Sequence, residues 1–232
     1  MNVTLISSII SGVLAIIAVC ITTYNQNKVN KINNAINARK KHQYYLEPLI
    51  RSAADLQSRL YNILGGGFIE RYYHKGNKRH QNYVINNTVF LIAQFFAWTE
   101  AARIDVQFIN LENDSKTRKL SKLQSNIYSL IQTDRLGPFF IFFAGEQRAI
   151  GEEMLTKVDG GYNCIGYGEF LKANAFSDNA LFNELKNEVL KMTENISNYR
   201  PRLEILQHAL IDMLDYLDPN NVRINKNERS KI

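Results

Sequence analysis

Two clusters of charged residues stand inside otherwise apolar sequence, where charged side chains must find partners or ligands. Glu100 and Arg103 lie three residues apart in the string AWTEAARIDVQF, a spacing that brings both side chains to one face of a helix. Glu146, Arg148 and Glu152 follow the apolar run FFIFF within the string AGEQRAIGEEM. We predict that these charges form either an internal ion network between the two segments or the lining of a ligand pocket.

The sequence lacks the usual metal and cofactor motifs. It has two cysteines, Cys20 and Cys164, with no C-x-x-C and no H-E-x-x-H motif, and neither His74 nor His80 has a thiol nearby. It has no P-loop, no dinucleotide fingerprint and no serine in a nucleophile elbow. We therefore predict no metal and no cofactor. Enzymatic activity stays open, and the sequence favours a protein without it.

Arg202 and His208 enclose five residues in the last predicted helix. This spacing resembles the motif of HEPN ribonucleases, helical proteins that use an arginine and a histidine against the 2′-hydroxyl and scissile phosphate of RNA. The resemblance implies a membrane-tethered effector that binds or cuts RNA, usually as a dimer, with Arg202 and His208 as catalytic residues. Leu203 departs from the family pattern, which has a polar residue after the arginine. The alternative is an exposed arginine and a half-buried histidine without a catalytic role.

Longer strings resemble a family of uncharacterised bacterial membrane-anchored proteins. In chain order, behind one apolar N-terminal segment, they are FFAWTEAARIDVQFINL, FAGEQRAIGEEM, CIGY and RLEILQHALIDMLDYLDP. The resemblance would cover nearly the whole chain. It implies an anchored helical domain in which the Glu-Gln-Arg segment is a signature, and it implies no activity.

The N-terminal segment predicts a membrane anchor. Residues 1–27 carry no charged side chain and are mostly apolar, which is long enough to cross the hydrocarbon core of a bilayer as a helix. Five cations and no acid follow in residues 28–41; they are Lys28, Lys31, Arg39, Lys40 and Lys41. Such cations stay on the cytoplasmic side and attract anionic lipid. We therefore expect a single-pass protein of the bacterial inner membrane with its C-terminal domain in the cytoplasm.

Two alternatives accompany the anchor. Cys20 follows Ile17, Ala18 and Val19 and so faintly resembles a lipoprotein cleavage site, but a secretory signal peptide has its cations before the apolar stretch rather than after it. A stripe of small residues also runs along one helix face; it consists of Ser7, Ser11, Ala15, Ala18 and Thr22. Small faces let membrane helices approach closely, so the stripe predicts a homo-oligomer, unless it only reflects how common these residues are in such helices.

The elements that must position the charged clusters are helices. Apolar residues recur at helical spacing over residues 44–64, 84–111, 116–131, 145–157, 178–196 and 201–217. The run at 139–144 is apolar throughout, so periodicity cannot assign it, and 68–83 is expected to be a basic, aromatic loop. We predict an all-α protein with a transmembrane anchor at 1–27, a basic stalk at 28–41, a bundle of five to seven helices at 42–219 and a disordered basic tail at 220–232.

The net charge of +6 is unevenly distributed. The stalk carries +5, while residues 68–83 and 220–232 carry +3 each, so the remainder of the chain carries −5. The folded body is therefore acidic. Anionic lipid accounts for the stalk cations, whereas the basic segment 68–83 could meet lipid, RNA or a protein partner equally well. We expect a tethered interaction or sensor module that recognises a protein or a small charged ligand near Arg103, Glu146, Arg148 and Glu152, with RNA as the alternative.

Overall fold

The computed structural model describes residues 3–106, 114–172 and 178–232. The structure does not describe the side chains of residues 3–6, 38–43, 105–106, 114 and 116–117. The described chain divides into two compact units, Met1–Gln43 and Tyr44–Ile232.

The first unit is the N-terminal part of helix α1 (Val3–Leu64). Its segment Ser7–Asn37 has a mean hydropathy of 2.0 and is long and apolar enough to cross a membrane. The large apolar side chains are exposed along it, as at Ile16 and Val19. Lys28 and Lys31 are exposed too, whereas the side chains of Arg39, Lys40 and Lys41 lie outside the description.

Helix α1 continues through Pro48 without a break. A proline inside a helix loses one hydrogen bond and costs about 3 kcal/mol. Tyr45, Leu49 and Ile50 around it are buried in the core, and this packing outweighs the loss. The expected helix at 44–64 is therefore the C-terminal part of a longer one.

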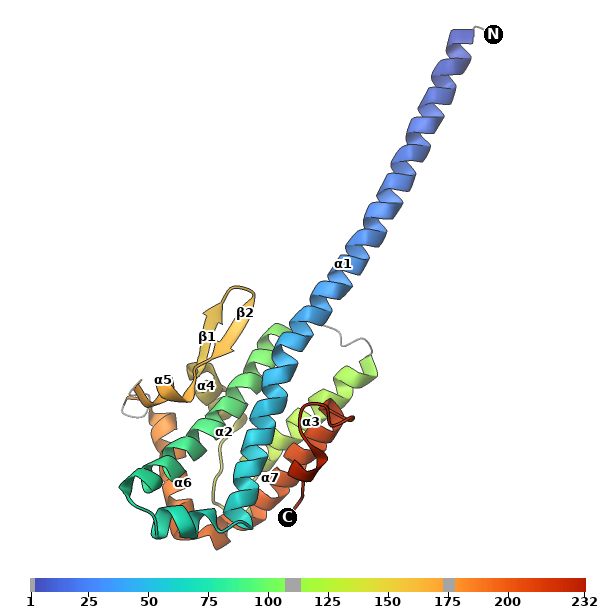
Figure 1. Ribbon diagram of the computed structural model, residues 1–232. Coiled ribbons are helices and arrows are strands. Elements are labelled where there is room, and N and C mark those ends of the chain that lie inside the picture. The colour runs from blue at the N-terminus through green and yellow to red at the C-terminus, as the bar shows by residue number, and fades with distance from the viewer. Residues whose placement is uncertain (1–2, 107–113, 173–177) are drawn as a thin grey trace. The chain divides into compact units, whose positions relative to one another are not determined.

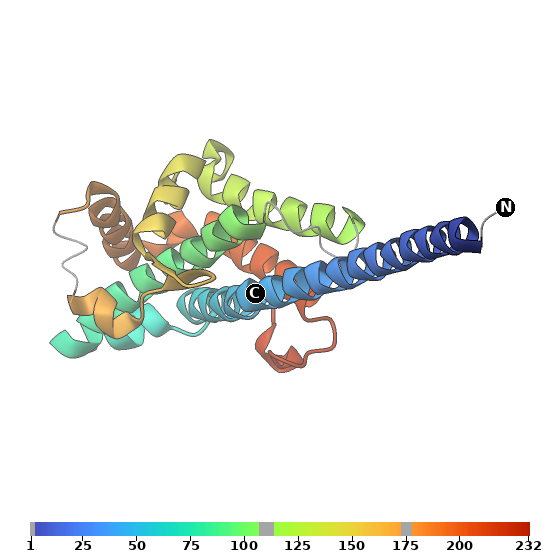
Figure 2. The same ribbon diagram turned by 90° about the horizontal axis from the view of Figure 1, so that it is seen from above.

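The second unit is an all-α body, which confirms the predicted fold class (Figure 1). Its helices after α1 are α2 (Lys78–Val106), α3 (Asp114–Gln132), α4 (Ala144–Glu153), α5 (Tyr167–Lys172), α6 (Ala180–Glu194) and α7 (Ile196–Leu217). Helix α2 is buried over most of its length and packs against α4, α5 and α6, while α3 packs against α7. Figure 2 shows the same body from above.

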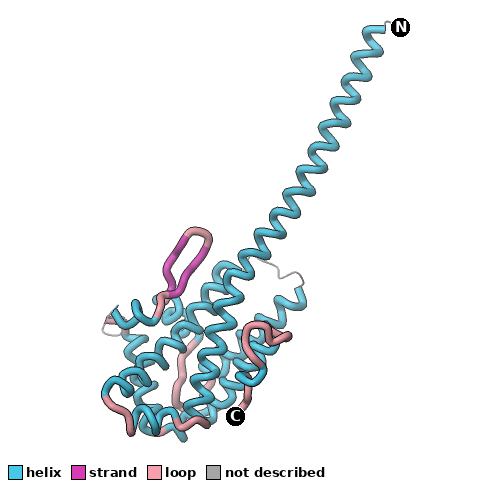
Figure 3. Tube along the Cα trace, viewed as in Figure 1, coloured by secondary structure: helices cyan, strands magenta, loops and turns pink. Residues whose placement is uncertain are grey.

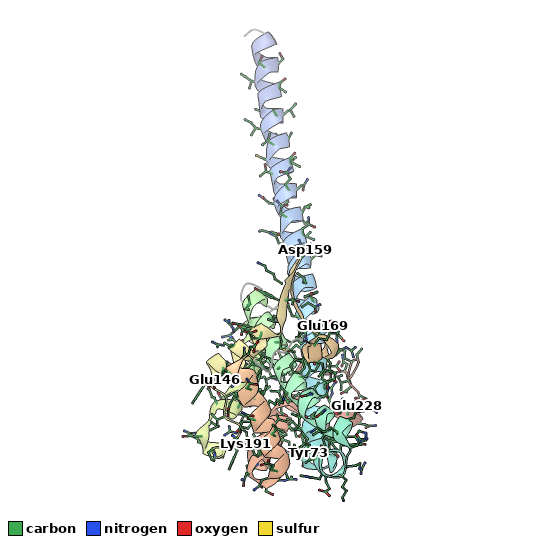
Figure 4. The ribbon with its side chains drawn as sticks, turned by 90° about the vertical axis from the view of Figure 1, so that its left-hand side faces the viewer. Tyr73, Glu146, Asp159, Glu169, Lys191 and Glu228 are labelled. Atoms are coloured by element: carbon green, nitrogen blue, oxygen red, sulfur yellow. The ribbon has the colours of Figure 1, made fainter. Side chains whose placement is uncertain are left out.

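Two expectations about local structure were wrong. Residues 68–83 are not a loop, since they contain a π-helix at Glu70–His74 and the start of α2. The helix predicted at 145–157 ends at Glu153, and strands β1 (Leu155–Val158) and β2 (Gly161–Cys164) follow it as an antiparallel hairpin (Figure 3). Asp159 lies at the hairpin tip (Figure 4), where Gly160 has a φ of +87° that favours glycine.

The tail at 220–232, which we expected to be disordered, is folded onto the body. Asp218 and Arg229 are both buried and form an ion pair of 2.5 Å. The Asp218 carboxylate also accepts hydrogen bonds from the backbone N–H groups of Val222, Arg223 and Ile224. Burial raises the pKa of Asp218, but these three bonds and Arg229 together hold it below its ordinary value of 3.8. The partner of the basic tail is thus an acid at the end of α7, which composition alone could not identify.

Candidate functional site: a polar cleft between α2, α3 and α4

Close packing of α4 against α2 brings the two predicted charge clusters together. Gly151 makes this approach possible, because a Cβ atom at that position would lie 2.7 Å from the Phe96 carbonyl oxygen. Gln147, which is buried, donates to the carbonyl oxygens of Phe142 and Tyr128 and so ties α4 to α3. The three helices therefore have a fixed mutual arrangement.

The first cluster is an ion pair on α2, as its spacing predicted. The Glu100 carboxylate is fully buried, and it accepts hydrogen bonds from Arg103 Nε at 2.7 Å and Nη2 at 2.5 Å. Such a two-point contact satisfies the carboxylate and raises the pKa of Arg103. The Arg103 side chain remains 40% exposed, so its outer N–H groups face the surface.

In the second cluster, Glu146 has a structural hydrogen bond, whereas Arg148 has no partner in the described residues. Glu146, labelled on α4 in Figure 4, accepts from the backbone N–H of Phe143 at 2.7 Å and caps its own helix. Glu152 is exposed, and its charge acts on Arg103 across the helix pair. Arg148 is exposed and makes no hydrogen bond or ion pair within the described ranges of the chain. The expected network is thus only partly formed, and Arg148 stays outside it.

Arg148 and Arg103 border a cleft of about 410 Å³. Its lining is rich in hydroxyl and amide groups and contains no carboxylate; besides the two arginines it consists of Thr99, Ser121, Gln124, Ser125, Tyr128, Ser129, Gln132 and Ala144. The volume lies in the range of small-molecule sites, but the polar lining suits a hydrophilic ligand rather than an apolar one.

Tyr128 is the buried polar group of this cleft. Its hydroxyl is shielded from solvent and has no hydrogen-bond partner in the described part of the molecule. Burial raises its pKa, the negative charge of Glu100 raises it further, and Arg148 and Arg103 act in the opposite direction. The group is therefore a neutral hydroxyl at physiological pH. An unpartnered buried hydroxyl costs about 1–3 kcal/mol, so a site that keeps one invites a functional explanation.

Sequence reasoning did not find Tyr128, Gln147 or the serines of α3. The available indication was the spacing of Ser121, Ser125 and Ser129, which recur every fourth residue and thus lie on one face of an otherwise amphipathic helix. This face borders the cleft.

Arg202 lies elsewhere and holds a loop in place. Its side chain is buried, and four of its N–H groups donate to backbone carbonyl oxygens; the acceptors are Leu130, Thr133, Gly137 and Phe139. Burial lowers its pKa. It is thus neither exposed nor at the helix start, since α7 begins at Ile196. In this geometry Arg202 fastens the segment between α3 and α4 and has little capacity left for an RNA phosphate.

His208, the other residue of that motif, is half-buried and lies 2.7 Å from the carbonyl oxygen of Ile232 through Nε2. It therefore contacts the folded tail, while the Arg202 guanidinium contacts the α3–α4 loop. The two side chains have separate partners, and no observation here favours a shared ribonuclease site.

Metal binding has no support from side-chain clusters, since no group of three or more His, Cys, Asp or Glu residues gathers within the described ranges. Comparison with known proteins adds no relative. No family model matches the chain, and no curated protein or solved structure is significantly similar to it, so the cleft must be interpreted from its own chemistry.

Proposed function

We propose that this protein is a single-pass membrane protein whose α-helical body is a cytoplasmic sensor or interaction module, with the α2–α3–α4 cleft as its ligand site. The observation that carries the proposal is an unpaired Arg148 beside a cleft lined by polar groups. A cation without a partner at the edge of a small-molecule-sized cleft is suited to a small charged ligand.

The membrane part of the proposal rests on the apolar segment of α1 and the cations after it. Ser7–Asn37 has the length and hydropathy of a membrane span, and its exposed apolar side chains need an apolar surrounding. The five cations at 28–41, with no acid among them, favour a cytoplasmic position for the body and contact with anionic lipid.

Thiol labelling tests the orientation. Val222 is 78% exposed, so a Val222→Cys variant should react with a membrane-impermeant maleimide only after the cells are permeabilised. A cysteine introduced ahead of Met1 should react in intact cells. Reaction of Val222→Cys in intact cells would place the body outside the cytoplasm and overturn this part of the proposal.

A thermal-stability screen tests the ligand site. The full-length protein in lipid nanodiscs would be melted with a panel of small carboxylates, phosphates and sulfate, because a ligand that binds only the folded state raises the melting temperature. At least one anion should stabilise the wild type. Ser125→Trp, which fills the cleft, should abolish the effect, whereas Asn126→Trp on the outer face of α3 should keep it. No stabilisation by any anion would refute the site.

A further inference from the structure

The hydrogen-bond donors around the cleft indicate the class of ligand that it can bind. Arg148 presents a guanidinium whose N–H groups have no acceptor in the described part of the chain. A guanidinium binds two oxygens of a phosphate or carboxylate through parallel hydrogen bonds, a geometry that an ammonium group does not offer. The cleft thus has a free anion-binding group at its edge.

The electrostatic balance of the cleft is positive. Glu100 is the nearest buried acid, and Arg103 already pairs with both of its oxygens. Glu152 is exposed and outside the lining, and its charge acts on Arg103, so it offsets part of the positive charge at this edge. Arg118 and Lys122 border the adjoining groove on the outer face of α3, which shares Ser121, Ser125 and Ser129 with the cleft. An anion would therefore be attracted to this side of the body.

The neutral side chains of the lining offer more hydrogen-bond donors than the two oxygens of a carboxylate can accept. Three serine hydroxyls and two glutamine amides surround the space, besides the two guanidinium groups. A phosphoryl group offers three oxygens and several lone pairs, and it carries more than one negative charge near neutral pH. A carboxylate offers two oxygens and one charge, so it would leave more of these groups unmatched.

Tyr128 supplies the most specific contact. Its hydroxyl is neutral and has no partner, and the half-buried side chain lines the cleft, so a turn of the side chain toward the cleft would let the hydroxyl donate to a bound oxygen acceptor. Tyr128 lines the cleft together with Arg103 and Arg148, so it belongs to the groups that would surround the ligand.

Resting on the proposed function, we propose that the ligand of the cleft is a small organic phosphate, with its phosphoryl group bound by the Arg148 guanidinium and the Tyr128 hydroxyl. The serines and glutamines of α3 bind its remaining polar groups.

The test is titration calorimetry of the full-length protein in phosphatidylcholine nanodiscs, with inorganic phosphate and glycerol 3-phosphate as probes and acetate as the carboxylate. We expect both phosphates to bind more tightly than acetate. Arg148→Gln should weaken phosphate binding at least roughly tenfold, the factor that one charge-assisted hydrogen bond contributes. Arg71→Gln, a variant of an exposed arginine outside the cleft, should leave binding unchanged.

The remaining outcomes separate the two proposals. If acetate binds as tightly as phosphate and depends equally on Arg148, the anion site stands and the phosphate assignment is overturned. If no anion binds, both are refuted. Addition of phosphatidic acid to the nanodiscs identifies the source of the phosphate, because competition with glycerol 3-phosphate indicates a lipid headgroup and no competition indicates a soluble ligand.

Discussion

The α3–α4 loop should depend on Arg202 for its fold. In the variant Arg202→Lys the charge is kept, but one ammonium replaces a planar fork whose N–H groups reach four separate carbonyl oxygens. Hydrogen bonds to a charged group are worth about 1.5–3 kcal/mol each, so the four together contribute about 6–12 kcal/mol. The lysine can keep some of them and water can reach others. We expect a net loss of about 3–5 kcal/mol in the free energy of unfolding.

The assay is thermal unfolding of the full-length protein in nanodiscs, followed by far-ultraviolet circular dichroism. For a domain of this size, 1 kcal/mol corresponds to about 2–4 °C, so the melting temperature should fall by roughly 6–20 °C. Arg135→Lys is the matched control, since Arg135 belongs to the same loop and is exposed. A melting temperature of Arg202→Lys equal to that of the wild type would refute the structural role. A stable variant that had lost an RNA-cleaving activity would instead support the HEPN-like alternative.

Three further variants probe the body by the same melting assay. Gly151→Ala should destabilise the protein by about 1–3 kcal/mol, because its Cβ would press on the backbone of α2. Gly145→Ala, the control in the same helix, meets no atom within 4 Å and should be neutral or stabilise by up to about 1 kcal/mol. Equal effects of the two variants would contradict the close packing of α4 on α2. Thr88→Val should stabilise by about 1 kcal/mol, because the Thr88 hydroxyl is buried without a partner beside an apolar cavity of about 10 Å³; a loss of stability would show that the hydroxyl has a partner. Since the pKa of Asp218 is lowered on folding, its contribution is complete above its unfolded value near 3.8 and is lost as pH falls below it. Asp218→Asn should cost about 3–5 kcal/mol at neutral pH, because Arg229 loses its buried carboxylate partner and keeps only the exposed Asp215. The deficit should shrink in acid, and a deficit independent of pH would argue against the linkage.

The features that the sequence predicted correctly are local ones. Periodic apolar residues identified the helices of the body, and the three-residue spacing of Glu100 and Arg103 identified their ion pair. These features depend on residues close in the chain, so their physical cause is visible in the sequence.

The features that the sequence could not give depend on residues far apart. Arg202 finds its acceptors more than sixty positions away, in a loop whose carbonyl groups carry no sequence signature. Asp218 orders a tail that looked disordered by composition. Tyr128 resembles any core tyrosine until the fold places it beside Arg103 and Arg148. Long-range partners of this kind become predictable only with the tertiary arrangement.

The central claim is that the cleft keeps Tyr128 unpartnered for a bound anion, and one comparison tests it most directly. Wild-type protein and Tyr128→Phe would be melted with and without glycerol 3-phosphate. Without ligand the variant should be more stable by about 1 kcal/mol, because the buried hydroxyl is gone. A ligand at a hundred times its dissociation constant stabilises by about 2.7 kcal/mol, so wild type should gain roughly 5–11 °C and the variant clearly less. A less stable variant, or an unchanged ligand response, would contradict the account.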